Sequence, residues 1–256
     1  MKTALAFMKK DWTDQLRSAK FYILIGVFIL FGIMNPVTAK ITPWLFDILS
    51  ESLEGSGMNI QINEVTALDS WAQFYKNIST ALITFVLIES NILAKEIRSG
   101  TLILALTKGL DRYKVVISKS VVLTVLWTVC YWLCFAVTYC GNLIFWDNGI
   151  AQNLMFSAVC GWVFGLFICG VVVLASAIFG GNILVLAVTG GVSFVLSLLI
   201  MLPKVMDFIP TLLSDGTSLV YGLTNPNAYY KALAVTVVLT VACFVASIPV
   251  FNKKQL

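Results

Sequence analysis

Six stretches of about 20 mostly apolar residues alternate with more polar segments along the chain. They cover residues 21–39, 78–94, 120–145, 154–179, 183–202 and 232–251. About 20 apolar residues in a helix cross the roughly 30 Å of hydrocarbon in a bilayer. Only helices satisfy their own backbone hydrogen bonds in lipid, and these stretches are too long for barrel strands. The pattern therefore predicts an all-α integral membrane protein, with six transmembrane helices forming one domain over residues 1–256.

The first 20 residues predict an interfacial helix that lies along the membrane surface. Apolar residues recur on one arc at helical spacing, charged residues fall elsewhere, and Phe7 interrupts the pattern. The arc comprises Leu5, Met8, Trp12, Leu16 and Ala19, and the charged residues away from it include Lys10, Asp11, Asp14 and Arg17. Such a helix places its basic residues near anionic headgroups, with Trp12 as an anchor. The alternative is a basic flank that only sets the topology.

Two further segments, 40–77 and 203–231, are too long to be simple turns. The first predicts two short amphipathic pieces, one after Trp44 and one after Trp71, around a flexible Gly-Ser-Gly joint at 55–57. The second interrupts apolar residues with Pro210, Gly216, Gly222 and Pro226. It predicts short helices that dip back into the outer leaflet, which is tolerated where protein or water shields the backbone. An exposed loop is the alternative.

The distribution of basic residues orients the six spans. With a cytoplasmic N-terminus, 13 of the 17 Lys and Arg residues fall on the inner side, and only Lys40, Lys76, Lys204 and Lys231 fall outside. Inner loops of membrane proteins carry the excess of basic residues. We therefore expect a multi-pass protein of the cell membrane, most simply a bacterial plasma membrane, with both termini in the cytoplasm.

Composition and missing motifs narrow the function classes. The chain is 59% hydrophobic and 12% charged, against about 25% charged residues in soluble domains. It has no histidine and no G-x-x-x-x-G-K-[ST] phosphate loop, so we expect no ATP hydrolysis or histidine-based catalysis by this chain. We expect no cofactor, no metal and no nucleic-acid partner. The six cysteines lie in or beside apolar stretches, where we interpret them as packing residues.

Glu89 is the one acid well inside a predicted span. Ionisable residues within membranes are functional candidates and face a bundle interior or water. Glu89 lies five residues before the inner end of its span, about 7–8 Å at 1.5 Å per residue. Two interpretations stay open: a role in a transport pathway or in coupling, or a structural polar contact.

The charged segment, residues 95–119, separates the second and third spans. Six basic and two acidic side chains surround a short apolar run that includes Leu102, Leu104 and Leu106. Thr101 is placed to cap a helix over 102–108, Gly109 suits its left-handed end, and Asp111 is placed to cap the next helix. A short apolar helix at the water face favours docking into a groove of a partner; the alternative is a helix lying flat in the interface.

Part of this segment resembles a known family. Glu96, Gly100, Thr101 and Leu102, followed by Leu106, Arg112 and Lys119, resemble the E-x-x-x-G-T-L…L…R…K stretch of type-two ABC exporter permeases. The chain length, the six spans and the Lys9-Lys10-Asp11-Trp12 segment before the first span are similar too. The resemblance implies that the charged segment contains a cytoplasmic coupling helix, which docks on a separate ATP-binding subunit, and that residues 1–20 form an elbow helix.

The resemblance implies a permease subunit of an ATP-driven exporter. Two such subunits, identical or related, would enclose a pathway in membrane lipid and bind two ATPase subunits. The implied coupling residues are Glu96, Arg98, Gly100, Thr101, Leu102, Leu104, Leu106, Arg112 and Lys119. The apolar outer segments and the scarcity of intramembrane charge favour an amphipathic or hydrophobic cargo, such as a peptide, lipid or drug. Two alternatives stay open: an ATP-independent channel or ion-coupled transporter titrating at Glu89, and a membrane anchor that recruits a cytoplasmic protein.

Overall fold

Long helices form nearly all of the described chain. The computed structural model describes residues 2–53, 64–92, 107, 111–202 and 205–254, with the backbone alone at 2–5, 46–47 and 49–53. The long helices are α1 (Lys2–Arg17), α2 (Ala19–Leu53), α3 (Ala67–Glu89), α6 (Arg112–Phe145), α7 (Leu154–Ile178), α8 (Asn182–Leu199) and α10 (Tyr230–Lys253). The short ones are η2 (Asn148–Ile150), η3 (Met206–Phe208), η4 (Pro210–Ser214), α9 (Thr217–Val220) and η5 (Pro226–Tyr229).

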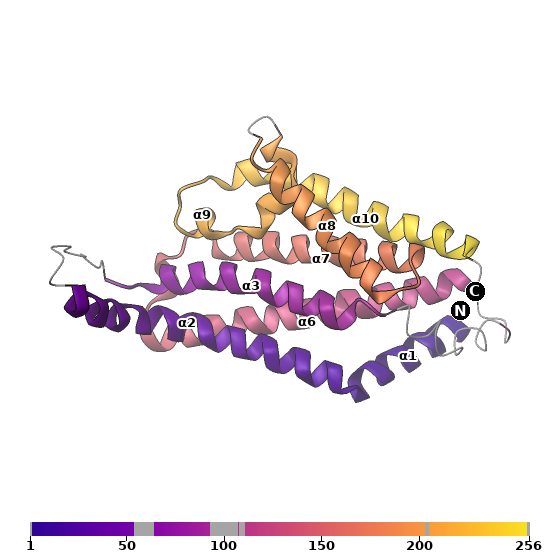
Figure 1. Cartoon of the computed structure of the whole chain (residues 1–256), viewed down its shortest axis with the longest axis horizontal. Coiled ribbons are helices and arrows are strands. Elements are labelled where there is room, and N and C mark those ends of the chain that lie inside the picture. The colour runs from indigo at the N-terminus through magenta and orange to yellow at the C-terminus, as the bar shows by residue number, and fades with distance from the viewer. Residues whose placement is uncertain (1, 54–63, 93–106, 108–110, 203–204, 255–256) are drawn as a thin grey trace.

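Successive long helices from α2 onward run back and forth along one bundle (Figure 1). Both termini lie at the same end, here called the near end, and the C-terminus of α2 and the N-terminus of α3 lie at the opposite, far end. Helix α7 occupies the centre and packs against α6, α8 and α10. Helix α1 bends away from α2 at Ser18 and packs on the near end of α6.

Five helices are long and apolar enough to cross a membrane, judged by length and composition within the described residues. They are Ala19–Leu45, Arg112–Phe145, Leu154–Ile178, Asn182–Leu199 and Pro226–Lys253. The structure thus shows an all-helical fold suited to multiple membrane passes. Helix α3 is absent from this set although its 23 residues would extend about 34 Å. It carries Asp69, Lys76 and Glu89 among other polar residues, so the sixth span stays a prediction.

The segment 40–77 differs from its prediction. Helix α2 continues without a break to Leu53, and α3 already begins at Ala67, so both predicted amphipathic pieces belong to long helices. Thr66 starts α3 through a capping box in which its backbone N–H donates to Asp69 Oδ2 at 2.8 Å. A capping box satisfies backbone donors that a helix start leaves free. The second predicted span, 78–94, therefore corresponds to a helix that begins and ends earlier.

Pro36 lies inside α2, where its missing N–H deprives the Gly32 carbonyl of a helical partner. The Thr138 hydroxyl of α6 donates to that carbonyl at 3.1 Å, and Asn35 Nδ2 donates to Thr138 Oγ1 at 2.8 Å. Asn77 Nδ2 of α3 donates to Asn35 Oδ1 at 2.7 Å. This set, the far-half seam, joins α2, α3 and α6 through neutral groups and explains how α2 continues through a proline.

The segment 203–231 contains the short helices η3, η4, α9 and η5. Its apolar residues Leu213, Leu219 and Val220 are buried, and η4 packs on α7 and α10. Gly216 lies so close to Tyr75 that a Cβ would stand 2.3 Å from the ring. The depth of these helices in a membrane stays a prediction.

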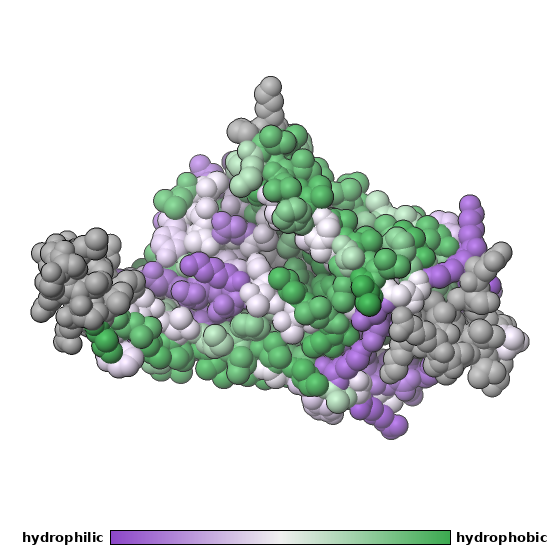
Figure 2. Space-filling view, in the orientation of Figure 1, coloured by the Kyte–Doolittle hydropathy of each residue, from purple (hydrophilic) through white to green (hydrophobic). Residues whose placement is uncertain are grey.

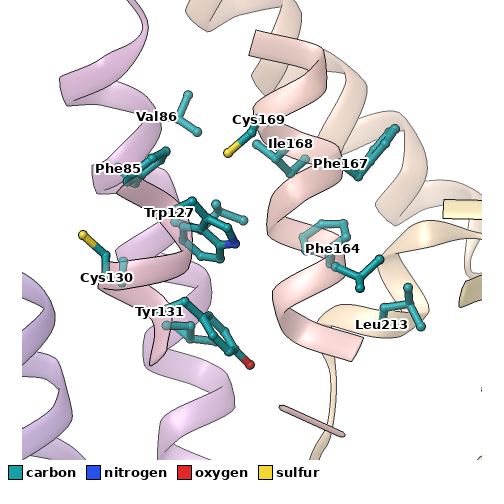
Figure 3. Close-up of a cluster of buried hydrophobic side chains, with 14 of the residues drawn as sticks. Phe85, Val86, Trp127, Cys130, Tyr131, Phe164, Phe167, Ile168, Cys169 and Leu213 are labelled. Carbon is teal, nitrogen blue, oxygen red and sulfur yellow. The ribbon is translucent and has the colours of Figure 1, made fainter. Parts of the chain in front are cut away.

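Aromatic side chains of α6 fill the core against small residues of α7. Trp127 and Tyr131 are fully buried and point toward α7 beside Phe164 and Ile168 (Figure 3). A Cβ on Gly165 would stand 2.1 Å from the Trp127 ring, and one on Gly161 would stand 2.8 Å from the Tyr131 oxygen. These glycines therefore admit rings of the same chain. All six cysteines are free, and most of them are buried here.

Candidate functional site at the near end of the bundle

One face of α1 is directed into the protein. Phe7, Asp11 and Gln15 recur every four residues and so share this face. Phe7 packs against the core, Asp11 is 4% exposed, and Gln15 reaches α3. The predicted apolar arc is offset from this face, with Met8, Trp12 and Leu16 only half-buried.

Asp11 forms a buried ion pair with α6. Lys119 Nζ donates to Asp11 Oδ1 at 3.0 Å, and Ser118 Oγ donates to Asp11 Oδ2 at 2.6 Å. Both carboxylate oxygens thus accept a hydrogen bond from α6. The Lys119 ammonium also lies 5.9 Å from the centroid of the Phe7 ring, within the range of a cation–π contact. Buried charges are tolerated when they are paired in this way.

Glu89 is the last residue of α3 and is 2% exposed. Gln15 Nε2, one helical turn beyond Asp11, donates to Glu89 Oε1 at 2.9 Å. One face of α1 therefore contacts the end of α3 through Gln15 and the start of α6 through Asp11. Asp11, Gln15, Glu89, Ser118 and Lys119 are called the near-end cluster below.

Other polar contacts hold the end of α3 to α2, α7 and α8. Lys20 Nζ donates to the Ile88 carbonyl at 2.9 Å and to Asn91 Oδ1 at 2.8 Å. The Ser90 hydroxyl hydrogen-bonds the Asn182 side chain at the start of α8. Ser176 Oγ of α7 donates to the Ser90 carbonyl at 3.5 Å. The C-terminus of α3 thus contacts four other helices as well as its own chain neighbours.

The start of α6 is joined to the C-terminus of the chain. Arg112 Nη1 donates to the Lys254 carbonyl at 2.5 Å and to the Asn252 carbonyl at 3.2 Å. Lys254 Nζ donates to the Ala177 carbonyl at the end of α7 at 3.2 Å. Burial lowers the pKa of the Lys254 ammonium, because desolvation disfavours its charged form. A cation at a helix C-terminus also complements the helix dipole.

Three of the predicted functional residues lie in the described part of the chain. Glu89, Arg112 and Lys119 all lie at the near end, and each bonds to a neighbouring element of its own chain. Glu96, Arg98, Gly100, Thr101, Leu102, Leu104 and Leu106 lie outside the described residues. Asp111 occupies the N-cap position of α6, as predicted, but its side chain makes no cap bond. It pairs with Lys114 at 2.5 Å instead.

Sequence reasoning missed Asp11 and Gln15. It placed Asp11 off the apolar arc and treated Phe7 as an interruption, whereas both residues face the protein. The spacing of Phe7, Asp11 and Gln15 at every fourth position was a signal for a shared face. However, the sequence does not show that Lys119 is the partner of Asp11, and an unpaired acid on this face suggested a solvated position.

The arrangement is suited to mechanical linkage. Within the described residues, no three His, Cys, Asp or Glu side chains gather as a metal site. The near-end cluster instead connects α1 to the two helices on either side of residues 93–110. Glu89 and Arg112 border that range, and their polar contacts reach α1 and the C-terminus of α10.

A comparison of the sequence with protein-family models and with curated proteins finds no match.

Proposed function

We propose that this chain is the permease subunit of an ATP-driven ABC exporter. The observation that carries the proposal is the position of the near-end cluster. Its residues join α1 to the end of α3 and the start of α6, and the segment between those two helices carries the motif that resembles a coupling helix. A force applied there by a partner would reach spanning helices through buried, paired groups rather than through solvated ones.

In this proposal the described coupling residues position the docking segment and do not touch the ATPase. Lys119 is buried against Asp11, and Arg112 is bound to the C-terminus of α10. They would fix the start of α6, while Glu89 fixes the end of α3. Glu96, Arg98 and the apolar residues Leu102, Leu104 and Leu106 would then meet the separate ATP-binding subunit.

A second permease subunit is supported by the surface of α3. Its far half exposes Lys76, Ser79 and Thr80, and Figure 2 shows hydrophilic surface there between hydrophobic regions of α2 and α8. If α3 forms the predicted sixth span, a charged side chain on this face would be costly in contact with lipid. This face would therefore line an aqueous pathway between two subunits, identical or related, of which both termini are cytoplasmic.

Co-purification with ATPase activity tests the proposal. The intact chain should co-purify with an ABC ATPase and should support ATP turnover in lipid. Gly100→Glu or Leu104→Glu should abolish turnover, because a bulky charge would occupy the docking helix. Lys231→Gln, at the far end, is the matched control and should retain it.

Two outcomes would replace the proposal. If the purified chain moves a substrate without any ATPase and ATP has no effect, it acts as a channel or an ion-coupled transporter. In that case Glu89→Gln should change the pH dependence of transport. If an ATPase or other cytoplasmic protein binds but nothing is translocated, the chain acts as a membrane anchor.

A further inference from the structure

An apolar groove opens between α3 and α8. Ile83 and Leu87 of α3 line one side, Leu186 and Gly190 of α8 line the other, and Ile168 of α7 contributes to the wall. Its cavity volume is about 330 Å³, within the usual range of ligand sites. Ile83 is 62% exposed and Leu87 is 54% exposed, so α8 leaves this face of α3 largely uncovered.

The same face of α3 becomes polar toward the far end. Lys76, Thr80, Ile83 and Leu87 follow the spacing i, i+4, i+7 and i+11, which places them in one stripe. Lys76 and Thr80 are exposed. Leu87 lies about 16 Å along the helix from Lys76. The surface is therefore amphipathic, with a cation at one end and an apolar groove at the other.

Lys76 has no partner for its charge among the described residues. It forms neither an ion pair nor a hydrogen bond with any of them. Asp69 lies on the same face two turns away, but its Oδ2 already accepts from the Thr66 N–H and its Oδ1 from the Tyr221 hydroxyl. The Lys76 ammonium is therefore available to pair with an anionic group of a ligand.

We propose that this surface binds a lipid with an acidic headgroup, with the headgroup at Lys76 and an acyl chain in the α3–α8 groove. The charge of Lys76 selects the headgroup, and the groove holds the acyl chain through van der Waals contacts with its apolar lining. The binding site is independent of any ATPase. That this lipid is the cargo, which narrows the amphipathic class expected above, rests on the proposed function.

Native mass spectrometry of the full chain in detergent tests the headgroup. The probes are phosphatidylglycerol and phosphatidylcholine with identical acyl chains. The wild-type chain should prefer phosphatidylglycerol by about fivefold, the effect of one cation near a lipid headgroup. Lys76→Gln should remove that preference, and Lys231→Gln, an exposed lysine at the far end of α10, should keep it. Equal binding of both lipids by the wild-type chain would overturn the proposal.

Two adjacent glycines of α8, Gly190 and Gly191, provide a test variant and its control for binding in the groove. A Cβ added at Gly190 or at Gly191 meets no atom within 4 Å, so leucine at either position should leave the fold intact, as circular dichroism would show. Gly190 lines the groove and Gly191 does not. Gly190→Leu should weaken binding of both lipids by about fivefold, the effect of losing on the order of six van der Waals contacts between the groove and the acyl chain. An equal loss in Gly191→Leu would overturn the proposal.

These experiments contain no ATPase, so their result is separable from that of the proposed function. Loss of ATPase co-purification with lipid selectivity retained would leave a lipid-binding membrane protein that is not a permease. The opposite pattern would leave a permease whose cargo binds elsewhere, and it would refute this site.

Discussion

The near-end cluster and the far-half seam both connect α3 and α6 to an N-terminal helix, which is α1 in the first case and α2 in the second, and they use different chemistry. The near end uses a buried carboxylate, an ammonium and a second acid, whereas the far-half seam uses two amides, a hydroxyl and a carbonyl. Neutral interhelical hydrogen bonds in membrane proteins average about 0.6 kcal/mol. Removing one member of a buried ion pair costs about 3–5 kcal/mol. A single substitution should therefore lower the free energy of unfolding much more in the near-end cluster than in the far-half seam.

The largest expected effect is at Lys119. Lys119→Met leaves the Asp11 carboxylate buried without its ammonium, and should lower the free energy of unfolding by about 3–5 kcal/mol. Denaturant unfolding of the purified chain in detergent measures it. The double variant Asp11→Leu with Lys119→Met should recover most of the loss, because the buried Asp11 carboxylate is removed together with its ammonium partner. If Lys119→Met alone is as stable as the wild type, the near-end cluster contributes no more to stability than the far-half seam does.

Between the two regions, close packing of α6 against α7 holds the bundle together. A substitution at Gly165 tests the contribution of this packing. Gly165→Ala would place a Cβ 2.1 Å from the Trp127 ring, which forces the indole or the helix to shift. Overpacking of this kind costs about 1–3 kcal/mol. The same unfolding measurement should show the loss, together with a changed tryptophan fluorescence spectrum. Gly191→Leu on α8, which meets open space, is the control and should show neither change.

Within the far-half seam, the Thr138 hydroxyl should contribute more to the free energy of unfolding than an average neutral hydrogen bond. Thr138→Val leaves the Gly32 carbonyl without the donor that replaces the missing N–H of Pro36, and should cost about 1–2 kcal/mol. Thr138→Ser retains the hydroxyl and loses only one buried methyl group, so it should cost no more than about 0.8 kcal/mol. If valine and serine behave alike, the hydroxyl does not compensate for the proline.

The smallest effect is expected at Asn142, one turn beyond Thr138 on α6. It is fully buried, yet among the described residues neither its amide nitrogen nor its amide oxygen has a hydrogen-bond partner. Asn142→Leu should therefore be neutral or stabilising by up to about 1 kcal/mol, because it removes an unsatisfied polar group. A clear destabilisation in the same unfolding assay would mean that the amide is hydrogen-bonded and that the seam extends further than Thr138.

The apolar pattern was sufficient to predict the helical class, and Lys119 and Glu89 were singled out before their contacts were known. The start of α3 was not predictable in this way, because the Thr66 capping box and the buried side chains of Trp71 and Phe74 extend that helix before the apolar stretch. Asp11 was missed because its partner lies 108 residues away, and a local pattern carries no information about such a contact. The apolar part of the charged segment lies outside the described residues, so its docking helix stays a prediction.

The Asp11–Lys119 pair also has a consequence for biosynthesis. A chain emerging from the ribosome exposes Asp11 first, and its partner follows only when α6 has been made. Until then α1 has no counterpart for its acid and remains a surface helix with an unpaired charge. Closure of the pair therefore has to wait until the chain has been made through Lys119, so α1 docks on α6 only after α2 and α3 have been synthesised.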